Sequence, residues 1–347
     1  MLTRRTTKKV KSKQVSVKDS GAPRNNSFES NEGTTFPIVG IGASAGGLEA
    51  FKELLSHIPV NTGMAFVLIQ HLDPKHESLS AEILGRATSM PVNEVVDGMR
   101  VEPNRVYVIP PNCNLGLRHR LLKIQPRTES RGQHLPLDFF FQTLAEEQKT
   151  QAIGVVLSGT ASDGTEGLRA IKAEGGITLV QDPESAKYDG MPRSAIASGA
   201  VDLIRTPEGI ATELARIAKH PYVIPQGTEF DQEPAKKDEN LPKIFSLLRS
   251  VTSVDFSHYK SNTIQRRIAR RMLLQKTVDL TLYAKYLESH PDEIKALFAD
   301  ILIHVTGFFR DKTAFEALKT QMLPKYMKNR DRSLPFRVWV PGCSTGE

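Results

Sequence analysis

A glycine-rich turn carries the first serine whose surroundings suit covalent chemistry. Residues 39–48 read Val-Gly-Ile-Gly-Ala-Ser-Ala-Gly-Gly-Leu and join an apolar run to an amphipathic stretch. Ser44 would lie at a helix N-terminus, whose N–H groups and partial positive charge favour an oxyanion. Two other interpretations stay open. Gly40, Gly42 and Ala45 fit the loose dinucleotide pattern G-x-G-x-x-G/A, and the glycines could equally serve close helix–sheet packing alone.

A histidine and an aspartate follow two later apolar runs. His71 lies in Gln-His-Leu-Asp-Pro, and histidine is the side chain best suited to accept a hydroxyl proton near neutral pH. Asp163 stands in a glycine-rich loop, either as a helix N-cap or as the carboxylate that orients His71. Sheets of parallel strands place their functional sites at the carboxyl ends of the strands. Ser44, His71 and Asp163 are therefore expected to lie close together at that edge. Asp73 is the ribose candidate of the nucleotide interpretation.

Short apolar runs alternate with amphipathic stretches between residues 36 and 220. The expected strands are 37–42, 65–70, 105–109, 153–158, 177–181 and 201–204. The expected helices are 47–57, 78–87, 137–147, 165–173, 193–198 and 207–218. This alternation predicts an α/β domain with a mainly parallel, doubly wound sheet covered on both faces. Turn residues between short runs in 100–124 predict a β-hairpin excursion.

A second, all-α unit is expected after a polar linker at 221–240. Its expected helices are 241–251, 262–274, 280–290, 291–303 and 312–326, within a domain spanning 241–330. Residues 338–340 then read as a new strand that runs into a glycine loop. A strand and loop alone cannot fold, so we expect 331–347 to be the start of a third domain, cut short.

The charge of +7 is concentrated in two short segments of the 347 residues. Residues 1–35 hold eight basic and three acidic residues, and 256–276 hold six basic and none acidic, whereas 36–220 carry −3. The first segment reads as a disordered basic tail, and no nucleic-acid groove is expected along the main domain. Two distant cysteines exclude a disulfide framework or a cysteine-based zinc site, and no apolar run is long enough to span a membrane. A cytoplasmic protein without membrane insertion is expected.

The second basic segment predicts a helix with arginines on shared faces. Arg266 and Arg270 are four residues apart, as are Arg267 and Arg271. Ile264, Ile268 and Met272 would form the apolar stripe, and the arginines either a solvated face or a docking face for an acidic partner.

The three site motifs together resemble the catalytic domain of the chemotaxis protein-glutamate methylesterase (CheB) over about residues 36–218. They are Gly-Ala-Ser-Ala-Gly-Gly, Gln-His-Leu-Asp-Pro and Ser-Gly-Thr-Ala-Ser-Asp-Gly, and Met-Pro-Arg-Ser-Ala at 191–195 resembles a further stretch. The resemblance implies Ser44 as nucleophile, His71 as base and Asp163 as orienting acid, without a cofactor. It also implies the backbone N–H of Thr160 as oxyanion donor.

Residues 241–347 resemble the chemotaxis receptor methyltransferase (CheR). The arginine helix, Ile-His-Val-Thr-Gly-Phe-Phe-Arg-Asp at 303–311 and Trp-Val-Pro-Gly-Cys-Ser-Thr-Gly-Glu at 339–347 carry this resemblance. It implies S-adenosyl-L-methionine as the cofactor of the full-length methyltransferase. It also assigns receptor contacts to the arginine helix. The cofactor contacts implied by the resemblance are His304, Thr306, Arg310 and Glu347.

The function expected from these motifs is hydrolysis of glutamate γ-methyl esters on chemoreceptor cytoplasmic domains or similar methylated signalling proteins, with glutamine deamidation by the same acyl chemistry. Residues 1–347 alone are not expected to transfer methyl groups. The alternatives are a non-catalytic receptor-binding signalling scaffold and a nucleotide-binding α/β domain.

Overall fold

A seven-stranded parallel sheet forms the centre of residues 35–223 in the computed structural model, which describes residues 35–70, 80–126, 135–223, 240–302, 312–328 and 337–340. The strand order is β3-β4-β2-β1-β7-β8-β9. The strands are β1 (Ile38–Ala43), β2 (Ala65–Gln70), β3 (Val92–Glu94), β4 (Val106–Val108), β7 (Ala152–Val156), β8 (Ile177–Gln181) and β9 (Leu203–Arg205). Every neighbouring pair is parallel, which confirms the predicted sheet.

Strand β1 lies between β2 and β7, with all six of its residues buried. Burial on both faces explains why its sequence is apolar throughout and does not alternate. The register sets Ala43 beside Gln70 of β2 and Gly42 beside Val156 of β7. The carboxyl ends of the three strands therefore meet at one edge of the sheet, where Ser44 follows β1.

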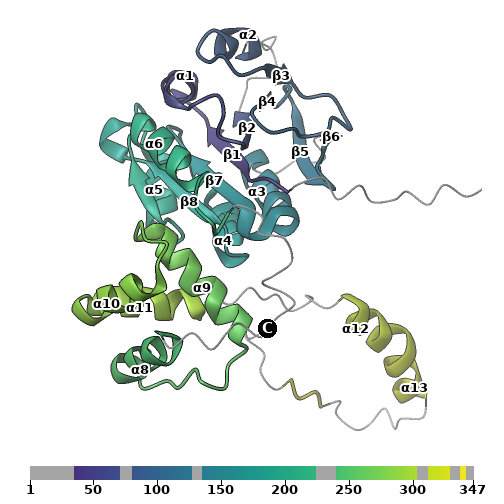
Figure 1. The fold of residues 1–347 in the computed structure, drawn as a ribbon. Helices are drawn as coiled ribbons and strands as arrows, with labels where there is room; N and C mark the ends of the chain where they lie inside the picture. Colours follow the sequence, from purple (N-terminus) through teal and green to yellow (C-terminus); the bar gives the residue numbers. More distant parts are fainter. Residues whose placement is uncertain are drawn as a thin grey trace, which may run out of the picture. The chain divides into compact units, whose positions relative to one another are not determined.

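Helices cover both faces of the sheet (Figure 1). They are α1 (Gly47–His57), α2 (Ser80–Gly85), α3 (Pro136–Gln148), α4 (Thr165–Ala173), α5 (Gly190–Ala197) and α6 (Pro207–Ile217). One apolar core gathers side chains of α1 and α6, such as Phe51 and Leu214, and the other gathers those of α3 and α4, such as Phe140 and Leu168. Burial of a side chain of this size contributes about 1.5–3 kcal/mol each, so the two cores hold the layers together.

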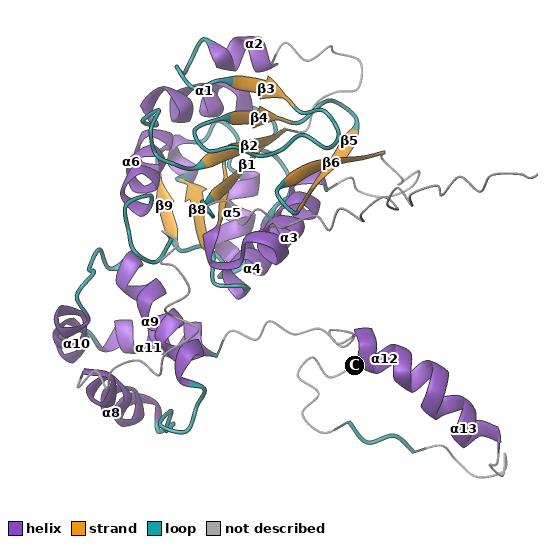
Figure 2. Cartoon of the chain, turned by 45° about the vertical axis from the view of Figure 1, so that its right-hand side comes forward, coloured by secondary structure: helices purple, strands orange, loops and turns teal. Residues whose placement is uncertain are grey.

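An antiparallel hairpin, β5 (Cys113–Arg118) and β6 (Leu121–Pro126), leaves the parallel layout (Figure 2). His119 and Arg120 form its two-residue turn with φ of 49° and 59°. Positive φ at both positions is the geometry of a type I′ turn, whose twist matches that of the strands. The predicted hairpin excursion is confirmed.

Four helices form a second unit: α8 (Asn240–Thr252), α9 (Ser261–Leu274), α10 (Leu280–Ser289) and α11 (Pro291–Ile301). Its core contains the stripe predicted on α9, namely Ile264, Ile268 and Met272. Val223, which falls within the predicted linker, is buried in the core of the first unit.

The last described residues contain the predicted helix but not the predicted strand. Residues 312–328 are helical as α12 (Lys312–Ala317), the π-helical turn η3 (Leu318–Met322) and α13 (Leu323–Lys328), and neither η3 nor α13 contains a buried residue. Residues 338–340 form no strand. Trp339 is 87% exposed, and within the described ranges no strand pairs with it, so its backbone lacks the ladder that makes an extended segment a strand. The predicted basic tail lies outside the described residues, as does the predicted glycine loop after residue 340. Among the described residues, no helix has the length and apolar character needed to cross a membrane.

Candidate active site

Ser44 lies on a tight turn between β1 and α1. Its backbone N–H donates to the carbonyl of Ser158 at 3.0 Å, and its own carbonyl accepts from the N–H of Gly47 at 2.9 Å. Gly46 supplies the left-handed conformation of the turn with φ of 70°, which a side chain would strain. The Ser44 side chain is half-buried at the N-terminus of α1, where free N–H groups favour developing negative charge.

The two glycines inside β1 have a packing role. A Cβ at Gly42 would lie 1.9 Å from Leu137 Cδ2, and one at Gly40 would lie 2.8 Å from Phe141 Cε1. Both glycines therefore let α3 approach the strand. Gly40 and Gly42 are the first two glycines of the dinucleotide pattern. Their contact with α3 supports the packing interpretation for both.

Ser158 ties the serine turn to the loop that precedes α5. Its hydroxyl donates to the carbonyl of Ala45 at 3.0 Å and accepts the N–H of Tyr188 at 3.0 Å. Its backbone N–H donates to the side chain of Gln181 at 2.9 Å. Neither Ser158 nor Gln181 is among the predicted site residues. The available signal was a glutamine closing the buried strand β8.

The loop from Gly159 to Ala161 borders Ser44. A Cβ at Gly159 would lie 3.0 Å from Ser44 Cβ and 2.1 Å from Met191 Sδ, so only glycine fits. The loop is anchored by the N–H of Gly159 to Tyr188 and by the N–H of Met191 to the carbonyl of Gly159, both at 2.9 Å. Ala161 has φ of 68° without being glycine, a strained conformation of the kind that clusters at functional sites. Thr160, the predicted oxyanion donor, is exposed between them.

Asp163 lies two residues before α4 but caps a different helix. Its two carboxylate oxygens accept the backbone N–H groups of Leu137 at 3.1 Å and Asp138 at 2.9 Å, at the start of α3. The side chain is 4% exposed. The simple N-cap interpretation for α4 is therefore replaced by a cross-helix contact that fixes the carboxylate in a buried position.

Asp138, in the first turn of α3, makes the reciprocal contact with the first turn of α4. Its Oδ1 accepts the N–H of Gly167 at 2.7 Å, so each of the two helices is capped by an aspartate associated with the other. Burial raises the pKa of Asp138 to about 6, and the negative charges of Asp163 and Glu166 add to this rise against the opposing N–H of Gly167. Asp138 was not among the predicted site residues, because an aspartate in the first turn of a helix is unremarkable by sequence.

Several predicted site residues lie outside the described residues. His71 is one, although β2 ends at Gln70 beside Ala43, immediately before it in the chain. The predicted cofactor contacts are the others: His304, Thr306, Arg310 and Glu347.

The arginines predicted as a docking face are mostly engaged within the chain. Arg270 is fully buried between Asp202 and Asp300, so its predicted receptor contact is corrected. Arg271 pairs with Glu293, and Arg267 donates to backbone carbonyls at the end of α4. Arg266 alone of the four is exposed.

Comparison with known families identifies the domain that holds Ser44 and Asp163. The family model described as CheB methylesterase matches residues 39–214, just over half of the chain. The chain belongs to the CheB methylesterase family. The match covers the Ser44 turn and the loop from Ser158 to Asp163. A second model, described as the all-alpha domain of CheR methyltransferase, matches residues 239–302, which contain α8 to α11.

Individual relatives of the CheB methylesterase family extend this picture. An uncharacterized 104.1 kDa protein of Rhodobacter capsulatus is 37% identical over 297 residues, covering 77% of this chain and 30% of that protein. A protein-glutamate methylesterase/protein-glutamine glutaminase of Rhizobium meliloti is 34% identical over 187 residues, covering 54% of this chain and 53% of that protein. The chain thus spans about half or less of these two relatives.

A solved CheB structure supports the fold. The crystal structure of the Thermotoga maritima CheB methylesterase catalytic domain is 29% identical, with a TM-score of 0.50, and covers 53% of this chain and 99% of that chain. The parallel sheet described above is therefore a complete CheB-type catalytic fold, followed by the CheR-type helical domain.

Proposed function

We propose that the CheB-type domain hydrolyses γ-methyl esters of protein glutamate residues, with Ser44 as nucleophile, His71 as general base and Asp163 as the carboxylate that orients the base. The observation that carries the proposal is the half-buried Ser44 on a glycine turn, with the strained Gly159–Ala161 loop packed against it. The family match supports the reaction class.

In the first half of the reaction, the Ser44 hydroxyl attacks the ester carbonyl while His71 takes the hydroxyl proton. The carbonyl oxygen gains negative charge, which the backbone N–H of Thr160 and the N-terminus of α1 are proposed to stabilise. His71 returns the proton to the leaving oxygen, methanol departs, and the glutamyl group remains bound to Ser44 as an ester.

In the second half, water repeats the attack. His71 takes a proton from water, the hydroxide adds to the acyl carbon, and the C–O bond to Ser44 breaks with return of the proton to Ser44 Oγ. The product is a glutamate carboxylate. The same acyl-enzyme forms from a glutamine side chain with loss of ammonia, so we include deamidation, an activity that relatives carry in their names.

Two further proposals concern the substrate and the full-length protein to which this chain belongs. We infer that the substrate is a methylated signalling protein of the chemoreceptor type in the cytoplasm. The CheR-type match supports a fused protein-glutamate methyltransferase that uses S-adenosyl-L-methionine. The residues expected to hold that cofactor lie outside the described residues, so no step is assigned to it here.

Methanol release from a methylated receptor fragment tests the esterase. Ser44→Ala removes the nucleophile and is expected to lower the rate by about three orders of magnitude or more. Ser56→Ala is the matched control, because Ser56 is an exposed serine at the other end of α1 that donates to the carbonyl of Glu53. Equal rates for the two variants would disprove the assignment of Ser44.

A further inference from the structure

Helix α9 contacts the first unit at the sheet edge opposite Ser44. Asp202 directly precedes β9 and Gly176 directly precedes β8, so both lie at the amino edge of the parallel strands. Ser44 follows β1 at the carboxyl edge. A partner bound at the amino edge therefore leaves the candidate active site uncovered.

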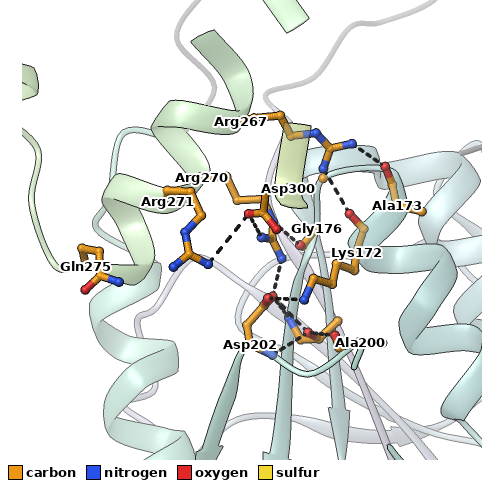
Figure 3. A network of polar contacts seen from close by, with 12 residues as sticks. Lys172, Ala173, Gly176, Ala200, Asp202, Arg267, Arg270, Arg271, Gln275 and Asp300 are labelled. Atoms are coloured by element: carbon orange, nitrogen blue, oxygen red, sulfur yellow. Dashed lines mark hydrogen bonds and ion pairs between the residues drawn. The ribbon is translucent and has the colours of Figure 1, made fainter. Parts of the chain in front are cut away.

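Arginine side chains of α9 make the polar part of this contact (Figure 3). Arg267 donates to the carbonyls of Lys172 at 3.2 Å and Ala173 at 2.7 Å, the last two residues of α4, whose carbonyls have no N–H partner in a following turn of the helix. Arg270 donates to the carbonyl of Gly176 at 3.1 Å and also pairs with Asp202. A cation at a helix C-terminus is favoured by the helix dipole as well as by these hydrogen bonds.

Asp202 is built to receive a cation. One of its oxygens accepts the backbone N–H and the hydroxyl of Thr178, at 3.0 Å and 2.9 Å, and pairs with Arg270. The ammonium of Lys172 lies 3.4 Å from the other oxygen. Burial opposes the charged carboxylate, but Arg270 and Lys172 outweigh it and hold the pKa of Asp202 below its ordinary value. A carboxylate buried in this way is costly unless its partner is present.

The contact also has an apolar part. Leu273 and Leu274 of α9 belong to the same buried cluster as Ile177, Ile217 and Val223 of the first unit. Arg216 donates to the carbonyl of Leu273 at 2.9 Å, and Lys276 pairs with Glu213 at 3.0 Å. The core of the CheB-type domain is thus continuous with side chains supplied by the CheR-type domain.

We propose that the amino edge of β8 and β9, with the end of α4, is a permanent docking surface for α9, so that the CheB-type and CheR-type domains form one body. The contact between α9 and this surface is called the joint. The basic face of α9 serves the joint and does not bind an acidic receptor. The occupant is α9 of the same chain, because a fully buried guanidinium meets two buried carboxylates there. The inference does not depend on the esterase activity.

Cleavage between the two domains tests the joint. A site-specific protease sequence is inserted between residues 223 and 240 of the full chain, and the cleaved protein is run on a gel-filtration column at micromolar concentration. We expect both fragments to elute together. Separate elution of the wild-type fragments would overturn the proposal.

Two arginines on α9 provide a matched pair for the same assay. Arg267 donates its hydrogen bonds to the carbonyls of Lys172 and Ala173 in the CheB-type domain, whereas Arg271 pairs with Glu293 and Asp300 inside the helical domain. Arg267→Ala is expected to weaken fragment association at least tenfold and Arg271→Ala to weaken it less, with hydrogen exchange in β1 unchanged as proof of folding. An equal effect of both variants would contradict the proposed joint.

Poly-glutamate tests whether an acidic partner can take the place of α9's docking surface. We expect poly-glutamate not to displace the helical fragment from the CheB-type fragment. Displacement at physiological salt would show that the basic face of α9 is open to acidic partners and would overturn the proposal.

Discussion

Replacing Asp138 by asparagine is expected to stabilise the CheB-type domain relative to the wild type, by an amount that grows as the pH rises. The substitution keeps an oxygen that can accept the N–H of Gly167, whose hydrogen bond to Asp138 measures 2.7 Å, and removes a buried negative charge beside Asp163. Asp138 is 6% exposed, so solvent does little to relieve that charge.

The magnitude follows from the pKa of Asp138. Its rise from 3.8 to about 6 means that the folded state holds the proton more tightly than the unfolded state. Between pH 4 and 6 the folded state binds more protons, and the free energy of unfolding of the wild type therefore falls as the pH rises. At about 1.4 kcal/mol per pKa unit, this one carboxyl costs the wild type at most about 3 kcal/mol by pH 7. Asparagine does not titrate, so the variant escapes this loss.

The assay compares the free energy of unfolding of Asp138→Asn and wild type at several pH values from 4 to 8. Urea-dependent hydrogen exchange of peptides covering β1 and β7 reads the unfolding of this domain at its own central strands. The difference, variant minus wild type, should rise by about 2–3 kcal/mol across this range and level off above pH 7. Asp97→Asn is the control, because the exposed Asp97 also accepts a backbone N–H, from Ile124 at 2.9 Å. A difference for Asp138→Asn that is flat or falls with pH would refute the reasoning.

Three further substitutions probe the site. Asp163→Asn is expected to lower methanol release by about two to four orders of magnitude, because the orienting charge is lost. It should also cost about 1–3 kcal/mol in unfolding, because asparagine keeps one acceptor oxygen for the two N–H groups of Leu137 and Asp138; Glu166→Gln, exposed in the first turn of α4, should stay near wild type in both measurements. Gly159→Ala introduces a methyl group that would lie 2.1 Å from Met191 Sδ, and is expected to cost about 1–3 kcal/mol in thermal unfolding and to lower kcat by displacing the loop beside Ser44. An unchanged melting temperature would contradict that packing. Ser158→Ala leaves the N–H of Tyr188 without its acceptor and should lower the free energy of unfolding by about 1–3 kcal/mol, read as faster hydrogen exchange at Tyr188. Unchanged exchange there would argue against a stabilising role for the Ser158 hydroxyl.

Local patterns predicted the elements well where burial is complete. The runs at 65–70 and 177–181 became β2 and β8 with the expected bounds, because a strand buried on both faces needs an unbroken apolar sequence. The three-residue strand β3 was missed. Only one of its residues is even half-buried, and the segment Val-Asn-Glu has too little apolar character to distinguish it from a loop.

Contacts between distant residues were beyond the reach of these patterns. Spacing along α9 placed Arg266 and Arg270 on neighbouring turns, but it carries no information on Asp202, 68 positions away from Arg270. The same holds for the reciprocal caps of Asp138 and Asp163, which are local features on two helices until the fold brings them together. Sequence therefore gave candidate reactive side chains, which stay predictions, and missed the polar groups that contact the Ser44 turn and Asp163.

Helix α4 has opposite charges at its two ends, each supplied by a different part of the protein. Asp163 stands two residues before its first residue, and the guanidinium of Arg267 donates to its last carbonyls. Nine residues at about 1.5 Å each separate the two ends, a distance of about 14 Å. Recombination that gives this CheB-type domain a new neighbour would consequently uncap the helix that follows Asp163, the proposed orienting carboxylate. A successful domain exchange has to bring its own cation and apolar side chains to that edge, and this limits which partners such a fusion can accept.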